Sequence, residues 1–189
     1  MSKINLLQIN SWCWIAWAIY WIAMSRSVNK TASSEGFLLR ASHLIPLTLG
    51  FVLIFSPNIV GLNRHDIHDS ISIEIFGTIL SIAGLSFAIW ERIHLGKYWS
   101  GIITLKEGHK LIRTGPYKLV RHPLYTGFLG GVLGSALTAH TYEAAIGLVL
   151  MFMTYLIKIR REEVFLTQQF GDEYAVFKRE VKALLPFIF

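Results

Sequence analysis

Long apolar segments constrain the fold of this chain more than any other feature of its sequence. Three of them, residues 6–24, 44–62 and 71–90, reach the length of about 20 residues that a helix needs to cross the apolar core of a bilayer. Charged residues make up only 16% of the chain, against about 25% in a typical soluble domain. The composition therefore argues against a soluble enzyme and against a disordered chain.

A fourth apolar region is interrupted by a short polar turn. Its first part, residues 124–139, is rich in glycine, and its second part covers residues 144–157. Two helices can approach closely where side chains are small, as they are at positions 127, 130, 131, 134 and 135. We therefore predict a tight helical hairpin, and with it an all-α polytopic membrane protein of about five transmembrane helices.

The distribution of basic residues predicts the orientation of the chain. Thirteen of the 18 lysines and arginines follow the third apolar segment. Because basic loops stay on the cytoplasmic side, residues 25–43, 91–123 and 160–189 are predicted to be cytoplasmic, and Met1 and the turn at 140–143 to lie outside. Membrane orientation also accounts for the net charge of +6, so we predict no nucleic-acid partner.

Several kinds of site are excluded by missing motifs. Cys13 is the only cysteine, which excludes an internal disulfide and a CxxC zinc site. The sequence also lacks the HExxH motif, the GxGxxG motif and a Walker loop. We therefore predict no metal site.

Two polar segments flank the predicted hairpin and are expected to meet at its open end. In the first, Gly115-Pro116 marks a turn. Pro123 suits the first turn of a helix, so a helix is predicted to begin near His122. We expect the N-terminal amide groups of this helix to face a cytoplasmic pocket and to stabilise an anion there.

The second polar segment follows the hairpin. Lys158 and Glu162 are four residues apart and so share one face of a helix, which Gly171 is predicted to end. A short amphipathic piece, 172–179, and an apolar tail, 184–189, follow, and the tail is expected to lie on the bilayer. Spacing alone leaves a second interpretation open, in which Lys158 and Glu162 form a surface ion pair and the basic run only sets the topology.

The ordered polar motifs carry a resemblance to a known family. The stretch GPYKLVRHPLYTG at 115–127 is followed some 35 residues later by Glu162-Glu163 and then by FGDEYAVFKREVKALLPF. This pattern resembles the isoprenylcysteine carboxyl methyltransferases, integral membrane enzymes that use S-adenosylmethionine. The related phospholipid N-methyltransferases share the RHPxY and EE elements. The resemblance implies a methyltransferase core at 71–189, preceded by two transmembrane helices at 1–70.

The resemblance also implies roles for individual residues. A lysine, Lys158, occupies the position of the family arginine near the substrate carboxylate, and Arg160 or Arg161 would be a substitute for it. We therefore name Lys158 and Arg161 as candidate catalytic residues. The residues that match the family's cofactor contacts, in a cytoplasmic pocket, are His109, Lys110, Leu111, Ile112, Tyr117, Arg121, His122, Pro123, Leu124, Tyr125, Glu162 and Glu163.

The expected activity is methyl transfer from S-adenosylmethionine to a lipophilic acceptor, with an isoprenylcysteine-like carboxylate favoured. The partners implied are a prenylated or other lipophilic acceptor and the membrane lipids. One alternative is N-methylation of a phospholipid amine, whose rate should rise with pH as the amine loses its proton. Another is a non-catalytic scaffold or a small transporter, although the internal repeats and broken helices of transporters are not evident in the sequence.

Overall fold

The computed structural model describes residues 5–25, 37–62, 66–67, 70–96 and 111–188, and the regular secondary structure in these ranges is helical. Two short 3-10 turns, η1 (Pro57–Val60) and η3 (Gly115–Lys118), accompany the long helices. The long helices are α1 (Leu6–Ser25), α2 (Phe37–Phe55), α3 (Ile71–Leu95), α4 (Pro123–Ala139) and α5 (Tyr142–Glu180). The all-α prediction is therefore confirmed for the described part of the chain.

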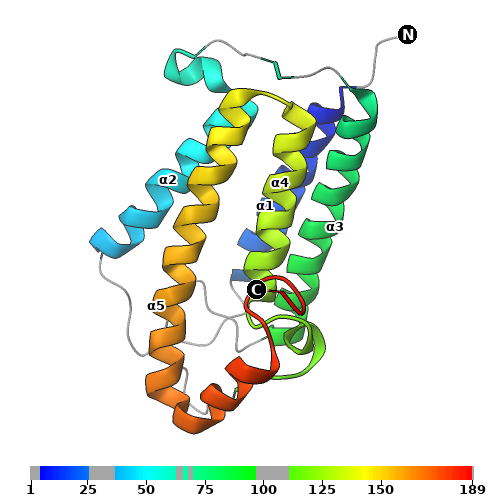
Figure 1. Ribbon diagram of the computed structural model, residues 1–189. Helices are drawn as coiled ribbons and strands as arrows, with labels where there is room; N and C mark the ends of the chain where they lie inside the picture. The colour runs from blue at the N-terminus through cyan, green and yellow to red at the C-terminus, as the bar shows by residue number, and fades with distance from the viewer. Residues whose placement is uncertain (1–4, 26–36, 63–65, 68–69, 97–110, 189) are drawn as a thin grey trace.

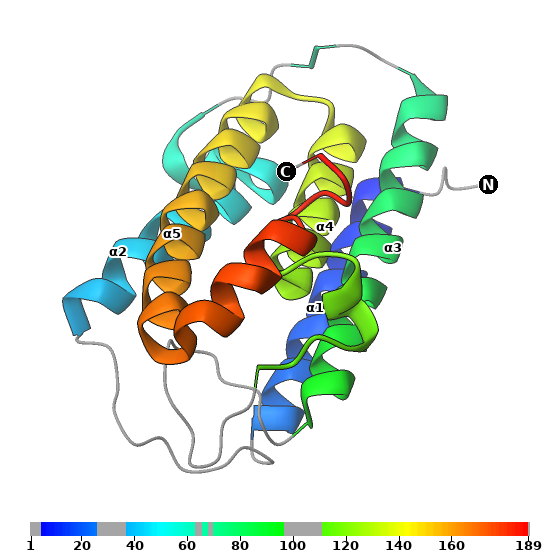
Figure 2. The same ribbon diagram turned by 60° about the horizontal axis from the view of Figure 1, so that its bottom comes forward.

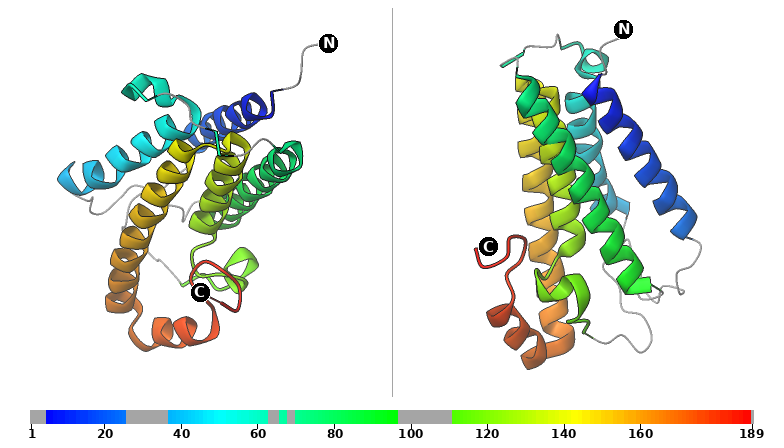
Figure 3. Two further views of the ribbon diagram at one scale, coloured as in Figure 1. Left: turned by 45° about the horizontal axis from the view of Figure 1, so that its top comes forward. Right: turned by 90° about the vertical axis from the view of Figure 1, so that its right-hand side faces the viewer.

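The helices form an elongated bundle, in which α4 packs chiefly against α3 and α5 packs chiefly against α2 (Figure 1). Helix α1 contacts α3 and α4. The two halves of the bundle are joined by the turn between α4 and α5, where His140 adopts a left-handed conformation with φ 42°. Figure 3 shows this turn and η1 at the same end of the bundle, away from η3 and the C-terminal segment.

The predicted helical hairpin of α4 and α5 is present, but the glycines of α4 face α3 rather than α5, so the tightest packing lies outside the hairpin. A Cβ atom added to Gly84 of α3 would lie 2.5 Å from the carbonyl oxygen of Gly127 and 2.5 Å from the backbone nitrogen of Gly131. The backbones of α3 and α4 therefore touch at positions where any side chain would collide. Helix α5 makes its own close approach elsewhere, at Gly147, where an added Cβ would lie 2.8 Å from the carbonyl oxygen of Gly50 in α2.

A buried polar cluster fixes α1 against the α3–α4 pair. The side-chain amide of Asn10, which is fully buried, lies 3.1 Å from the hydroxyl oxygens of both Thr78 and Thr138. The indole nitrogen of Trp14 donates to the Ser135 hydroxyl at 2.9 Å. Because polar groups in an apolar environment must find partners, these bonds hold α1 in one register.

Two helices of the described chain, Ile71–Leu95 and Tyr142–Glu180, are long and apolar enough to cross a membrane. Both expose large apolar side chains to their surroundings, among them Phe76, Ile79, Ile146 and Val149. Such exposure is unfavourable in water and natural in lipid. These features indicate a membrane protein.

Several predicted helix boundaries differ from those in the structure. The second apolar segment predicts a helix at 44–62 after a loop at 25–43, but α2 already begins at Phe37. It ends at Phe55, and Pro57 begins the separate turn η1. Proline lacks the N–H that would continue the helix, which explains the earlier end. Helix α3 runs past residue 90 to Leu95 and stops at Gly96, whose φ of 52° suits glycine.

Candidate functional site

The two polar segments meet at one end of the bundle, as predicted. The turn η3, the start of α4, the distal part of α5 and the C-terminal segment all gather there (Figure 2). The start of α4 agrees with the sequence: His122 is the N-cap and Pro123 occupies the first turn. Gly171, with φ 50° and ψ −124°, breaks α5, so the helix changes direction and returns toward α4.

Tyr125 and Glu162 connect α4 to α5. The Tyr125 phenol donates a 2.8 Å hydrogen bond to Oε2 of Glu162. The His122 ring stacks on the Tyr125 ring with the centroids 5.6 Å apart, and its Nδ1 lies 3.7 Å from the same carboxylate oxygen. His122 is buried, whereas Glu162 is partly exposed. The predicted cofactor residues His122, Tyr125 and Glu162 therefore share one cluster.

Glu163 anchors a second set of bonds, directed toward the returning end of α5. Its carboxylate accepts from Arg121 Nε at 3.0 Å, from Lys178 Nζ at 2.9 Å and lies 3.3 Å from His122 Nε2. Partial burial of Glu163 disfavours its charge, but the bonds from His122, Lys178 and Arg121 outweigh burial and hold the pKa of this carboxyl well below its usual range. Arg121 and Glu163 therefore clamp the helix that follows Gly171.

The C-terminal segment uses backbone donors at the start of α4. The N–H groups of Arg121 and His122 donate to the carbonyls of Lys182 and Ala183 at 2.8 and 3.0 Å. These two amides are thus already paired within the chain, whereas the amides of Leu124 and Tyr125, in the first turn of α4, stay the ones predicted to face the pocket. The apolar tail was predicted to lie on the bilayer, but only part of it is exposed. Leu184 is buried in the core, while Phe187 is 95% exposed.

Sequence reasoning missed Glu91, a buried carboxylate near the end of α3. The Tyr117 phenol donates to Glu91 Oε1 at 2.7 Å, and Glu91 is 1% exposed. Burial raises the pKa of Tyr117, and the neighbouring Glu91 and Glu162 carboxylates raise it further. Tyr117 is therefore hydrogen-bonded to Glu91 and within electrostatic reach of Glu162. The only sequence signal was a glutamate at the end of an apolar segment, where a residue at the bilayer surface is the commoner explanation.

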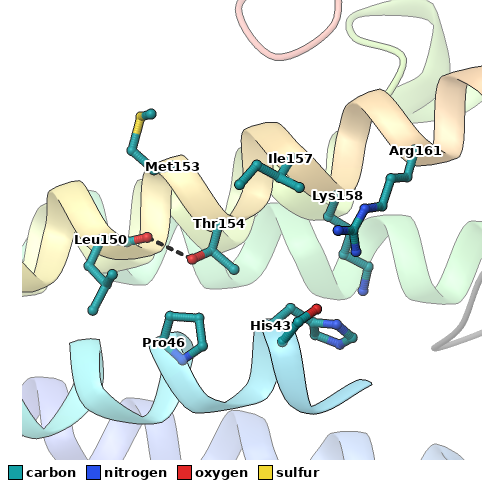
Figure 4. Close-up of a pocket in the computed structure, with 9 residues that line it drawn as sticks. His43, Pro46, Leu150, Met153, Thr154, Ile157, Lys158 and Arg161 are labelled. Atoms are coloured by element: carbon teal, nitrogen blue, oxygen red, sulfur yellow. Dashed lines mark hydrogen bonds between the residues drawn. The ribbon is translucent and has the colours of Figure 1, made fainter. Parts of the chain in front are cut away.

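A groove of about 320 Å³ lies between α2 and α5 beside this cluster. Its α5 side presents one helix face, with Leu150, Met153 and Ile157 followed by Lys158 and Arg161. Its α2 side includes Ser42, His43 and Pro46. Figure 4 shows the two cationic side chains gathered at one end of the groove, near His43.

Lys158 belongs both to the groove and to the surroundings of Tyr125. Its Nζ lies 5.5 Å from the centroid of the Tyr125 ring. Lys158 and Glu162, which were predicted to share one helix face, therefore both lie beside the Tyr125 side chain. Arg161 is exposed and lines the same end of the groove.

The remaining predicted residues have simpler surroundings. His109 and Lys110 lie outside the described residues. Leu111 and Ile112 are half-buried. Pro123 is buried, and Leu124 packs against the apolar core.

Comparison with known proteins places this arrangement in a family. The sequence model of the isoprenylcysteine carboxyl methyltransferase family matches residues 76–168. Protein-S-isoprenylcysteine O-methyltransferase B of Arabidopsis thaliana is 30% identical over 173 residues, which cover 88% of this chain and 84% of that protein. A probable protein-S-isoprenylcysteine O-methyltransferase of Oryza sativa subsp. indica is 36% identical over 107 residues.

The matches differ in how much of each relative they cover. The match to the rice protein covers 56% of this chain and 51% of the rice protein. The cobalt-zinc-cadmium resistance protein CzcN of Cupriavidus metallidurans is 34% identical over 108 residues, which cover 57% of this chain and 48% of that protein. The match to the Arabidopsis protein extends over most of both chains. The chain is therefore a member of the isoprenylcysteine carboxyl methyltransferase family.

Proposed function

We propose that this chain transfers a methyl group from S-adenosylmethionine to the carboxylate of a lipophilic, isoprenylcysteine-like acceptor. The names of the rice and Arabidopsis relatives support the reaction type. The observation that carries the proposal is the position of Lys158, which joins an apolar groove to the Tyr125–Glu162 pair. An acceptor and a cofactor held at these two places would be neighbours.

The groove suits an acceptor with an apolar chain and an anionic end. Its volume of about 320 Å³ lies at the small end of the range for ligand pockets, roughly 300–1,000 Å³. Met153 and Ile157 are each about half exposed, so an apolar chain in the bilayer can reach them. Lys158 and Arg161 then hold the carboxylate, Lys158 as a compact charge and Arg161 as a planar fork.

The cluster beyond Lys158 suits the cofactor. S-adenosylmethionine carries a sulfonium and an ammonium group, and carboxylates with aromatic faces favour such cations. We assign cofactor contacts to Tyr117, His122, Tyr125 and Glu162. In support, Tyr125 and His122 lie against the Glu162 carboxylate, and Tyr117 is within its electrostatic reach. His109, Lys110, Leu111, Ile112, Pro123 and Leu124 are assigned to the same pocket from the family motif. Arg121 and Glu163 act by positioning the helix after Gly171.

The reaction needs positioning more than proton transfer. S-adenosylmethionine supplies a methyl carbon on a positively charged sulfur. An acceptor carboxylate is already ionised near pH 7, so its oxygen attacks without a general base, and the bonding pair of the broken C–S bond stays on sulfur. Lys158 and Arg161 align the carboxylate, and the buried Tyr125 and His122 side chains exclude water from the cofactor side.

The arrangement also supports the predicted sidedness. The C-terminal end of α3, the start of α4 and the distal part of α5 lie together (Figure 2), and all three adjoin the segments predicted to be cytoplasmic from their basic residues. We propose five membrane-spanning helices, with Met1 and the turn between α4 and α5 outside. The polar cofactor then arrives from the cytoplasm and the acceptor from the bilayer.

A labelling experiment tests the proposed reaction. The purified chain in lipid nanodiscs is incubated with S-adenosylmethionine labelled on the methyl group and with N-acetyl-S-farnesylcysteine. The matched control is the same compound with a carboxamide in place of its carboxylate. We expect label in the acid alone, released by base as an ester requires. Equal labelling of the carboxamide, or label only in a phospholipid amine with a rate that rises with pH, would contradict the proposal.

A further inference from the structure

Only one of the two oxygens of the buried Glu91 carboxylate has a hydrogen-bond partner among the described residues. Its Oε1 accepts the Tyr117 phenol at 2.7 Å, while its Oε2 has no hydrogen-bond partner among the described residues. The side chain is 1% exposed, so water cannot readily replace the missing partner. A buried polar atom without a partner is uncommon in proteins and costs free energy.

Glu91 lies next to the proposed cofactor pocket. It shares Tyr117 with that pocket, and the Glu162 carboxylate is close enough to act electrostatically on both Glu91 and Tyr117. The next residue, Arg92, donates to the carbonyls of Met24 and Gly96 at 2.8 and 2.9 Å. Two carboxylates and two tyrosines, from α3, η3, α4 and α5, are thus close enough to interact electrostatically.

We propose that Glu91 is a further cofactor-binding residue, whose Oε2 accepts a hydrogen bond from the α-ammonium group of S-adenosylmethionine while Oε1 positions Tyr117. This inference rests on the proposed function. The unpaired oxygen calls for a hydrogen-bond donor, which the sulfonium is not. Among the donors of the cofactor the ammonium group alone is charged, and a charged donor best matches a site with two carboxylates.

Binding of two cofactor analogues tests this assignment without relying on turnover. S-adenosylhomocysteine keeps the ammonium group, whereas 5′-methylthioadenosine lacks the amino-acid portion and keeps the ribose and adenine. Glu91→Gln can retain the Tyr117 bond through its amide oxygen but presents an NH₂ group where Oε2 stood. Titration calorimetry should show an affinity for S-adenosylhomocysteine that is roughly 10- to 100-fold weaker, and an affinity for methylthioadenosine within about twofold of wild type.

The matched control is Glu74→Gln, at the opposite end of the same helix. Glu74 lies 17 residues before Glu91, or about 25 Å along α3, and should leave both affinities unchanged. If Glu91→Gln does not yield folded protein, Glu91→Asp retains the charge on a shorter side chain, and the same selective loss is expected. The selectivity between the two ligands separates cofactor contact from a merely structural role, since distortion of the pocket would weaken both.

The outcomes distinguish this inference from the function on which it rests. If wild-type protein binds neither analogue, the proposed cofactor is wrong. If wild type binds both and Glu91→Gln or Glu91→Asp binds them as wild type does, only the role of Glu91 is wrong. Equal weakening of the two analogues also overturns the ammonium contact.

Discussion

The phenol of Tyr125, in the first turn of α4, donates a 2.8 Å hydrogen bond to Oε2 of Glu162, far along α5. Helix α4 packs chiefly on α3, and α5 packs chiefly on α2. The bond therefore joins the two halves of the bundle at the end where the motif residues gather. Lys158 lies beside the same tyrosine ring and also lines the groove between α2 and α5, so one end of the groove is close to this bond.

Removing the charge of Glu162 should weaken cofactor binding. A hydrogen bond to a charged group contributes about 1.5–3 kcal/mol, so Glu162→Gln should lower the affinity for S-adenosylhomocysteine roughly 10- to 100-fold. Tyr125→Phe keeps the aromatic ring at the pocket and removes only the hydrogen bond to Glu162, so the loss should be smaller, about 2- to 10-fold. Titration calorimetry measures both. Glu173→Gln, an exposed change on the returning part of α5, is the control, and equal affinities in all three variants would remove Glu162 from the cofactor site.

Adding a methyl group at Gly84 should destabilise the bundle. The new Cβ would lie 2.5 Å from two backbone atoms of α4, and neither can move without separating the helices. Overpacking of this kind costs about 1–3 kcal/mol. Gly130→Ala is a matched control in α4, because its Cβ would meet its nearest neighbour, Gly84 Cα, at an ordinary 3.6 Å. Thermal unfolding in detergent should show a lower midpoint for Gly84→Ala only, and equal midpoints would contradict this packing.

Acid should loosen the part of α5 that follows Gly171. Because the pKa of Glu163 in the folded chain lies below its ordinary value of 4.5, its ion pairs stabilise the fold fully above that value. This stabilisation is lost as the pH falls from 4.5 toward the lowered pKa. The melting temperature of wild type should therefore drop more between pH 6 and pH 3 than that of Glu163→Gln. Parallel pH profiles for the two proteins would show that the clamp does not stabilise the fold.

The sequence predicts local features of the site because each depends on neighbouring residues. Pro123 begins a helix and Gly171 breaks one, since proline fixes φ and lacks an N–H while glycine tolerates positive φ. The apolar segments likewise place α1, α3 and α4 within about five residues of their observed bounds, and they place the start of α5 but not its end.

The parts that the sequence does not predict depend on which helix meets which. The small residues at Gly127 and Gly131 mark a close contact, but only the fold shows that the partner is Gly84 of α3. The groove is assembled from α2 and α5, which are far apart in the chain. In the sequence, Glu91 resembles any polar residue at the end of an apolar segment. Only the structure shows that it accepts a hydrogen bond from Tyr117.

The most direct test of the account is the turnover of Lys158 variants with the farnesylcysteine acid, measured together with S-adenosylhomocysteine affinity. If the ammonium group holds the acceptor carboxylate, Lys158→Ala should lower kcat/KM for the acceptor roughly 10- to 100-fold and leave cofactor affinity within about twofold. Lys158→Arg should retain activity, because a guanidinium group binds a carboxylate in two places. Arg160→Ala, exposed and outside the groove lining, should behave as wild type. Normal turnover in Lys158→Ala would contradict the central claim that this lysine joins the acceptor groove to the cofactor pocket.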